Sequence, residues 1–162
     1  MNLLQFEIKV IEYSDKSEMP ENDRHLLEKA VEATTTAYAP YSTFKVGAAV
    51  RLAGGEIFTG SNQENSAYPS GICAERVAIF AASSQHPGEA IEVIAIAAQT
   101  ESFELLNPVT PCGSCRQVMA EYQNLSGQPI RVIMKGMTRK IWVVDGVEDL
   151  LPLMFHADRL KK

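Results

Sequence analysis

The segment IEVIAIAA, residues 91–98, decides the expected fold because it is a short, almost continuously apolar run. Apart from Glu92, every residue in it is either β-branched or small. A strand with one solvated face alternates apolar and polar residues, whereas a strand covered on both faces is apolar throughout. We therefore expect residues 91–98 to form a strand buried on both faces of a sheet.

The segments on either side of this strand predict both helices and further strands. Upstream, Gly54 and Gly55 separate two extended runs, which is typical of a hairpin. Helices are expected from Pro20 to before Pro40, over residues 73–82 and over residues 115–122, and further strands over residues 45–52, 56–59, 130–134 and 140–144. This order predicts an α/β fold, a three-layer sandwich with a mixed central sheet and helices on its faces.

The chain length favours one domain. With 162 residues, 46% of them hydrophobic, the chain can build one packed core but not two ordinary ones. We expect an N-terminal extension over residues 1–19, a single domain over residues 20–157 and a basic tail over residues 158–162. Phe6, Ile8 and Val10 alternate with charged residues, so the extension could form an edge strand.

The charge distribution argues against polyanionic partners. The net charge is −5, and no cluster of Lys and Arg offsets it, so we expect neither a nucleic-acid polymer nor a membrane as a partner. Charged residues interrupt the apolar ones over residues 1–15, which excludes a signal peptide or a membrane span there. The expected location is the cytoplasm.

The three cysteines suggest a metal site instead of a disulfide scaffold, since their number is odd and no secretion signal is present. Cys112 and Cys115 lie in PCGSCR, residues 111–116, at the start of an expected helix. Residues three apart share a helix face, and the helix N-terminus favours the thiolate that zinc binds. This pair alone also fits a redox dithiol or two buried cysteines.

Cys73 shifts the balance towards zinc because it too begins an expected helix, with Glu75 two residues further on. Three protein ligands leave the fourth zinc position open, as catalytic sites require. The histidines, His25, His86 and His156, lack ligand-like spacing and are expected on the surface. Taken alone, Glu75 also fits a first-turn glutamate that favours the helix dipole.

Three segments closely resemble the cytidine deaminase family: YAPYSTFKVGAAV (residues 38–50), GSNQENSAYPSGICAER (residues 60–76) and VTPCGSCRQV (residues 109–118). The last two carry the Cys-x-Glu and Pro-Cys-x-x-Cys signature of zinc deaminases. The resemblance runs from about residue 20 to residue 155. It implies hydrolysis of cytidine and deoxycytidine to uridine and deoxyuridine with release of ammonia, in pyrimidine salvage.

The resemblance also implies roles for individual residues. Zn²⁺ would be held by Cys73, Cys112 and Cys115, and Glu75 would move the protons. The residues implied in substrate binding are Phe44, Asn62, Glu64, Ala74 and Phe155. Phe155 corresponds to an aromatic residue that enters a neighbouring subunit's site in the small homotetrameric members, so a homotetramer is implied as well.

Two departures from the family pattern affect the neighbouring contacts. Gln63 stands where the family has Val, and Leu153 and Met154 replace smaller residues near the end. Without the resemblance, Asn62 and Glu64 also fit a loop turn, and Phe44 fits a core ring.

Three thiolates on Zn²⁺ would give the centre a net charge of −1, which weakens the metal as a Lewis acid. Arg76 is the nearest cation in the sequence, and we hypothesise that it hydrogen-bonds the ligand thiolates; the alternative is a surface ion pair. Two other functions stay open: a deaminase of a related cytosine nucleoside such as blasticidin S, and a non-enzymatic zinc or CxxC redox module.

Overall fold

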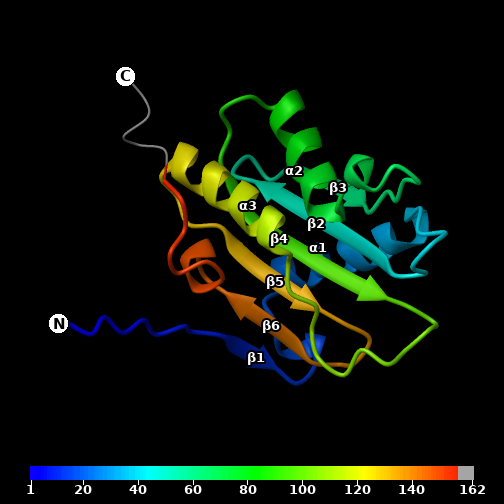
Figure 1. Ribbon diagram of the computed structural model, residues 1–162, viewed down its shortest axis with the longest axis horizontal. Coiled ribbons are helices and arrows are strands. Elements are labelled where there is room, and N and C mark those ends of the chain that lie inside the picture. The colour runs from blue at the N-terminus through cyan, green and yellow to red at the C-terminus, as the bar shows by residue number, and fades with distance from the viewer. Residues whose placement is uncertain (157–162) are drawn as a thin grey trace.

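The computed structural model describes residues 1–156, so residue 157 of the expected domain and the basic tail over residues 158–162 lie outside the described part. A six-stranded sheet with the order β1-β6-β5-β4-β2-β3 forms its centre (Figure 1). The strands are β1 (Ile11–Tyr13), β2 (Lys45–Leu52), β3 (Ile57–Ser61), β4 (Ile91–Gln99), β5 (Arg131–Lys135) and β6 (Ile141–Val144).

The apolar strand expected over residues 91–98 is confirmed as β4. It lies between β5, with which it pairs in parallel, and β2, with which it pairs antiparallel. All of its residues are buried except Glu92 and Gln99. Because the remaining strand pairs are antiparallel, the sheet is mixed, as expected.

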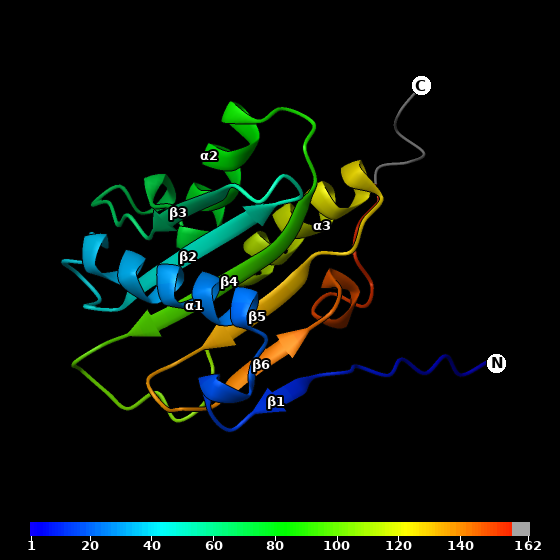
Figure 2. The ribbon, with the colours of Figure 1, turned by 180° about the vertical axis from the view of Figure 1, so that it is seen from behind.

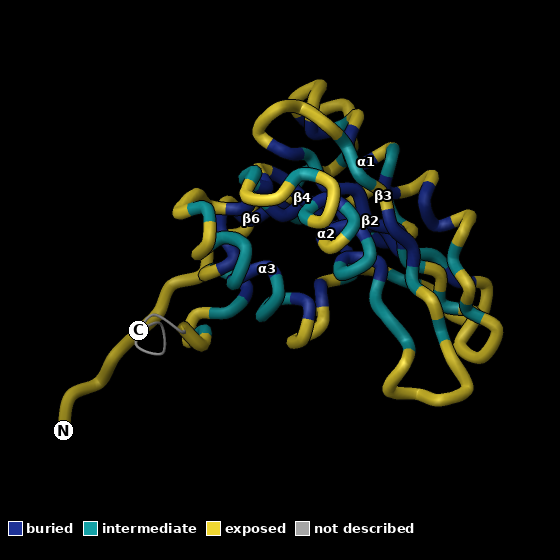
Figure 3. Tube along the Cα trace, turned by 90° about the horizontal axis from the view of Figure 1, so that it is seen from above, coloured by how far each residue is buried: buried dark blue, intermediate teal, exposed yellow. Residues whose placement is uncertain are grey.

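Helices cover both faces of the sheet, which confirms the three-layer fold. Helix α1 (Glu21–Ala33) lies on one face, and α2 (Ala74–Gln85) and α3 (Gly113–Ser126) lie on the other (Figures 1 and 2). Leu26, Leu27 and Ala30 of α1 pack on one side of the sheet, whereas α2 and α3 bury Ile79 and Met119 on the opposite side. Figure 3 shows the buried residues concentrated in these layers, while the connections and the N-terminal segment are exposed.

Helix α1 ends earlier than Pro40 because three threonines follow it. The hydroxyl of Thr34 donates to Val31 O at 2.7 Å, Thr35 donates to Glu32 O at 2.8 Å and Thr36 donates to Ala33 O at 3.0 Å. These three residues form a short 3-10 turn. β-Branched residues that bond back to the preceding turn disfavour continuation of an α-helix.

Two glycines allow the helices to approach the sheet closely. A Cβ on Gly47 of β2 would lie 2.2 Å from Ala30 O of α1, and a Cβ on Gly60 of β3 would lie 2.6 Å from Ala78 N of α2. Real Cβ atoms essentially never approach backbone atoms so closely. Gly60 therefore fixes how near the first turns of α2 lie to β3.

The N-terminal extension contributes an edge strand, but not over the alternating residues 6–10. Strand β1 begins at Ile11 and pairs antiparallel with β6, with Ile11 opposite Val143. Strand β6 ends at Val144, so residues before Val10 have no β6 residue opposite them. The alternation of Phe6, Ile8 and Val10 thus predicted the paired strand too early in the sequence.

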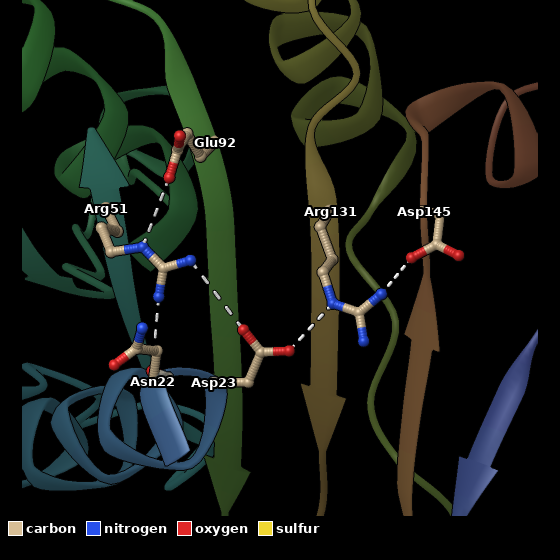
Figure 4. Close-up of polar contacts among 6 residues, drawn as sticks. All are labelled: Asn22, Asp23, Arg51, Glu92, Arg131 and Asp145. Carbon is tan, nitrogen blue, oxygen red and sulfur yellow. Dashed lines mark hydrogen bonds and ion pairs between the residues drawn. The ribbon is translucent and has the colours of Figure 1, made fainter. Parts of the chain in front are cut away.

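A charged network joins α1 to the sheet. The buried carboxylate of Asp23 lies 4.0 Å from Arg51 Nη2 and accepts a 2.9 Å hydrogen bond from Arg131 Nε (Figure 4). Arg51 also contacts Glu92 on β4, and Arg131 contacts Asp145 after β6. The network thus bridges β2 and β5 across β4.

Within residues 1–156, no helix has both the length and the apolar character needed to cross a bilayer.

Candidate active site

The N-termini of α2 and α3 bring the three cysteines together. Cys73 is the residue preceding α2, Cys112 is the residue preceding α3, and Cys115 lies one turn into α3. The Cys73 and Cys112 sulfurs are 3.9 Å apart, the Cys112 and Cys115 sulfurs are 3.5 Å apart, and all three lie within 4.8 Å of one another. No disulfide joins them, because all three are free thiols.

These separations fit zinc. Thiolates bound at about 2.3 Å in a tetrahedron lie roughly 3.8 Å from one another. The sulfur-only donor set also matches zinc, which readily takes thiolate ligands. Cys73, Cys112 and Cys115 can therefore hold the ion while leaving one tetrahedral position open.

The three sulfurs are close enough to shift one another's pKa. The neighbouring Cys115 thiol and, secondarily, Arg76 lower the pKa of Cys73 to about 5 against the opposing effect of burial. The neighbouring Cys73 sulfur and burial raise the pKa of Cys115. Three sulfurs this close cannot all carry negative charge unless a positive ion lies among them.

Glu75 lies beside the cysteines at the first turn of α2. Its side chain is only 4% exposed, yet it lines the same cavity as Cys73 and Cys112. Burial, and secondarily the charge of Cys73, raise the pKa of the Glu75 carboxyl above its usual value. A buried carboxyl beside a cavity is suited to general acid–base catalysis, since a raised pKa makes it a better proton acceptor.

Arg76 contacts one of the three sulfurs, which is the kind of contact hypothesised from the sequence. Its Nη2 atom lies 3.8 Å from Cys73 Sγ. Its Nε atom is buried and has no hydrogen-bond partner among the described residues. Within residues 1–156, Arg76 forms no ion pair with a carboxylate, so the geometry does not match the alternative of a surface ion pair.

A cavity of about 1060 Å³ opens over this cluster. Phe44, Asn62 and Glu64 line it together with Glu75 and Cys73. Ligand-binding cavities in proteins have about this size and combine apolar walls with a few polar groups. The structure thus brings three of the five expected substrate-binding residues to the same cavity as the cysteines.

Asn62 and Glu64 hold the loop before β2. The Asn62 amide accepts from Val46 N at 2.8 Å and donates to Phe44 O at 2.9 Å. The Glu64 carboxylate accepts from Tyr41 N at 2.9 Å and from both the backbone N–H and the hydroxyl of Ser42. These donors, the Ser42 hydroxyl foremost, lower the pKa of Glu64 and keep it ionised.

The other two expected substrate contacts are not among the described residues that line the cavity. Ala74 is fully buried in the core and is not among the described residues that line the cavity, so it can contribute only through its backbone. Phe155 is 63% exposed, and its carbonyl accepts from Gln117 Nε2 at 3.2 Å. It is likewise absent from the described lining of this chain's own cavity.

Phe103 is a cavity residue that the sequence analysis missed. Its ring lies parallel to that of Phe44, with 6.0 Å between the ring centroids. It belongs to the long connection between β4 and α3, and Ser102 beside it contacts Thr43 through their hydroxyls. Nothing in the polar run around Phe103 distinguishes it from an ordinary exposed loop residue.

Arg116 is a second residue without a predicted role. It donates to Pro111 O at 2.8 Å and to Leu150 O at 2.7 Å. These contacts attach the C-terminal segment to the loop that carries Cys112. Arg116 belongs to the PCGSCR motif, but the motif does not indicate that its partner is the carbonyl of Leu150, which is distant in the sequence.

None of the three histidines belongs to the cysteine cluster among the described residues, although a His86 ring nitrogen lies within 4.8 Å of carboxylate oxygens of Glu56 and Glu89. His25 and His156 are exposed, whereas His86 is half-buried, which differs from the surface position expected for it. The His86 ring packs edge-on against Phe58, and its Nδ1 lies 3.0 Å from Glu89 Oε2.

A mixed α/β sandwich with three thiols at two helix N-termini and a buried glutamate beside them is the arrangement expected of a zinc-dependent deaminase. Residues 20–126 match the family described as the cytidine and deoxycytidylate deaminase zinc-binding region. The chain is 43% identical over 135 residues to cytidine deaminase from Sporosarcina psychrophila, covering 83% of this chain and 92% of the relative. The chain belongs to the cytidine deaminase family.

Two further comparisons bear on this assignment. The crystal structure of cytidine deaminase from Burkholderia pseudomallei superimposes with a TM-score of 0.71 at 40% identity, covering 85% of this chain and all of that one. Blasticidin-S deaminase from Bacillus cereus is 29% identical over 137 residues, covering 83% of this chain and 93% of the relative. The similarity to a cytidine deaminase thus exceeds that to the blasticidin-S enzyme.

Proposed function

We propose that this protein is a zinc-dependent hydrolase that converts cytidine and deoxycytidine, with water, to uridine and deoxyuridine and ammonia. The observation that carries this proposal is the position of Glu75, buried beside three clustered thiols and facing the same cavity as Cys73 and Cys112. Fold similarity alone does not define an activity, but this arrangement provides both the metal ligands and the proton carrier.

Cys73, Cys112 and Cys115 would hold Zn²⁺, which supplies a Lewis acid that lowers the pKa of water. Glu75 accepts a proton from water and delivers it to N3 of the pyrimidine, so that C4 becomes electrophilic. The remaining hydroxide of that water bonds to C4. Glu75 then carries the proton of the new C4 hydroxyl to the exocyclic amine, the C4–N bond breaks, and ammonia leaves while the oxygen stays on C4 as a carbonyl. The burial of Glu75 raises the carboxyl pKa, which favours protonation of this group between the two transfers.

Arg76 would reduce the excess negative charge of three thiolates. Its guanidinium lies against Cys73 Sγ and helps to lower the pKa of that thiol. A hydrogen bond to a ligand sulfur withdraws electron density from the metal and preserves its acidity. We therefore assign Arg76 to the support of the metal ligands.

The cavity residues would bind the nucleoside. Glu64 is held as a carboxylate by Tyr41 and Ser42, which leaves it able to accept from the ribose hydroxyls. Asn62 has one further amide hydrogen for the same purpose, and Phe44 offers an aromatic face. Ala74 would contribute a backbone group.

We also propose the setting in which the enzyme acts. It would be a cytoplasmic homotetramer of pyrimidine salvage, in which Phe155 enters the site of a neighbouring subunit. Its exposed ring, which is absent from the described lining of the chain's own cavity, supports that assignment. The net charge of −5 supports a free nucleoside as substrate instead of a nucleic-acid polymer or a membrane-bound ligand.

A substrate panel tests the proposal. Zinc-loaded protein is incubated separately with cytidine, deoxycytidine and blasticidin S, and ammonia and the deaminated product are quantified. We expect rapid turnover of the first two and little of the third. Preferential turnover of blasticidin S would assign the chain to that activity instead.

Metal analysis distinguishes an enzyme from a redox module. We expect one zinc per chain and protection of all three cysteines from alkylation until a chelator is added. A metal-free protein that forms a reversible disulfide between Cys112 and Cys115 would instead be the redox module.

A further inference from the structure

The N-terminal segment, residues 4–10, is an extended chain with an uncovered apolar side. Leu4, Phe6, Ile8 and Val10 alternate with polar residues, and their exposed fractions are 79%, 53%, 54% and 48%. The segment runs directly into the edge strand β1, beyond the point where β6 ends (Figures 1 and 2). It lies before residue 20, where the match to the deaminase family begins.

One side of the segment's backbone faces the body of the protein. The Lys9 N–H donates to Asp149 Oδ1 at 3.2 Å, just beyond β6. Backbone groups alternate from side to side along a strand, so the amides of Phe6, Ile8 and Val10 point to the opposite, outer edge. An uncovered edge of this kind can pair with another strand.

The segment's own sequence complements this edge. When two copies of FEIKV, residues 6–10, align antiparallel about Ile8, Glu7 of each copy lies opposite Lys9 of the other. In the same register Phe6 lies opposite Val10, and Ile8 lies opposite its own copy. Opposite charges and apolar pairs facing each other stabilise neighbouring strands.

The backbone directions agree with that register. Phe6, Ile8 and Val10 would form the hydrogen-bonded pairs, because their amides point to the outer edge. Glu7 and Lys9 would form the non-hydrogen-bonded pairs, whose side chains approach more closely. A two-fold axis through Ile8 thus satisfies the backbone, the apolar side chains and the charges together.

We propose that residues 6–10 pair with the same residues of a second copy of this chain, forming a two-fold antiparallel strand contact centred on Ile8. The contact joins two sheets through the segments that precede β1. It requires neither the cavity nor the cysteine cluster, so it stands independently of the deaminase activity and of the proposed tetramer.

Cysteine cross-linking tests the register. In zinc-loaded Ile8→Cys protein, oxidised glutathione should produce a disulfide-linked dimer on a non-reducing gel, because opposed Cα atoms about 5.5 Å apart suit a disulfide. The matched control is Gln5→Cys in the same exposed segment, whose introduced thiols would lie roughly 20 Å apart across the axis. Wild-type protein, treated alike, should give no dimer. Absence of the Ile8→Cys dimer, or equal cross-linking of the Gln5→Cys control, would overturn the proposal.

Charge reversal tests the pairing of Glu7 with Lys9. In the Ile8→Cys background, Glu7→Lys alone or Lys9→Glu alone should lose the dimer, since each places like charges opposite one another. The double exchange should restore it. Co-expression of the two single-reversal chains should also restore it, because each then meets its opposite charge. If all these variants cross-link to the same extent, the two-fold register is wrong.

Discussion

Gly60→Ala tests whether the contact between β3 and α2 positions the metal ligands. The new Cβ would lie 2.6 Å from Ala78 N and 2.7 Å from Ala74 O, whereas ordinary contacts begin at 3.4 Å. The strand and the helix must therefore separate by the difference, about 0.8 Å. Overpacking of this kind costs about 1–3 kcal/mol of unfolding free energy.

The displacement acts on one ligand out of three. Cys73 moves with α2, whereas Cys112 and Cys115 belong to α3 and keep their relative positions. Because metal–ligand distances tolerate only about ±0.2 Å, we expect zinc affinity to fall by at least about tenfold. Zinc affinity is measured by competition with a chromogenic chelator, and stability is measured by urea unfolding.

Gly113→Ala is the matched control, since Gly113 also adjoins a cysteine ligand but its Cβ would meet nothing within 4 Å. Its zinc affinity should stay within about threefold of wild type, because no backbone movement is needed. If Gly60→Ala binds zinc as tightly as wild type and unfolds at the same urea concentration, the close packing of β3 and α2 does not position Cys73.

Three further variants test separate parts of the structure. Asp23→Ala should lower the unfolding free energy by about 1.5–3 kcal/mol, because it removes a buried carboxylate that contacts two arginines. Asp145→Ala, which removes an exposed carboxylate of the same network, should lower it by less than about 1 kcal/mol. Equal urea midpoints for the two variants would contradict this. Arg76→Gln should lower both zinc retention and kcat by leaving the charge of the Cys73 thiolate uncompensated, and wild-type values of both would exclude the role proposed for Arg76. Phe103→Ala should raise KM for cytidine about 3- to 10-fold through loss of an aromatic wall, and an unchanged KM would show that this ring does not contact the substrate.

The spacing of apolar residues predicted the layers of this fold, because the face that each helix or strand buries sets that spacing within its own segment. Residues 91–98 form the buried β4, and Leu26 and Leu27 face the sheet from α1, as their spacing indicates. The N-terminal strand was misplaced because Phe6, Ile8 and Val10 have the same alternation as a paired strand. Whether such a segment pairs depends on where the neighbouring strand ends, which its own sequence does not encode.

The sequence predicted those residues of the candidate site that belong to short motifs. Cys112 and Cys115 lie three residues apart, but their approach to Cys73 depends on how α2 and α3 pack against the sheet. The contacts of Glu64 with Ser42 and the stacking of Phe103 on Phe44 join residues far apart in the chain. No local pattern determines such pairs, because they arise from the arrangement of loops around the completed sheet.

The most direct test of the central claim compares wild-type protein with Glu75→Gln, measuring zinc content and ammonia release from cytidine on the same samples. Removing the ionisable group while keeping the size of the side chain should leave one zinc per chain and lower kcat by several orders of magnitude. Near-wild-type ammonia release from fully zinc-loaded Glu75→Gln protein would contradict the role of this carboxylate as proton carrier.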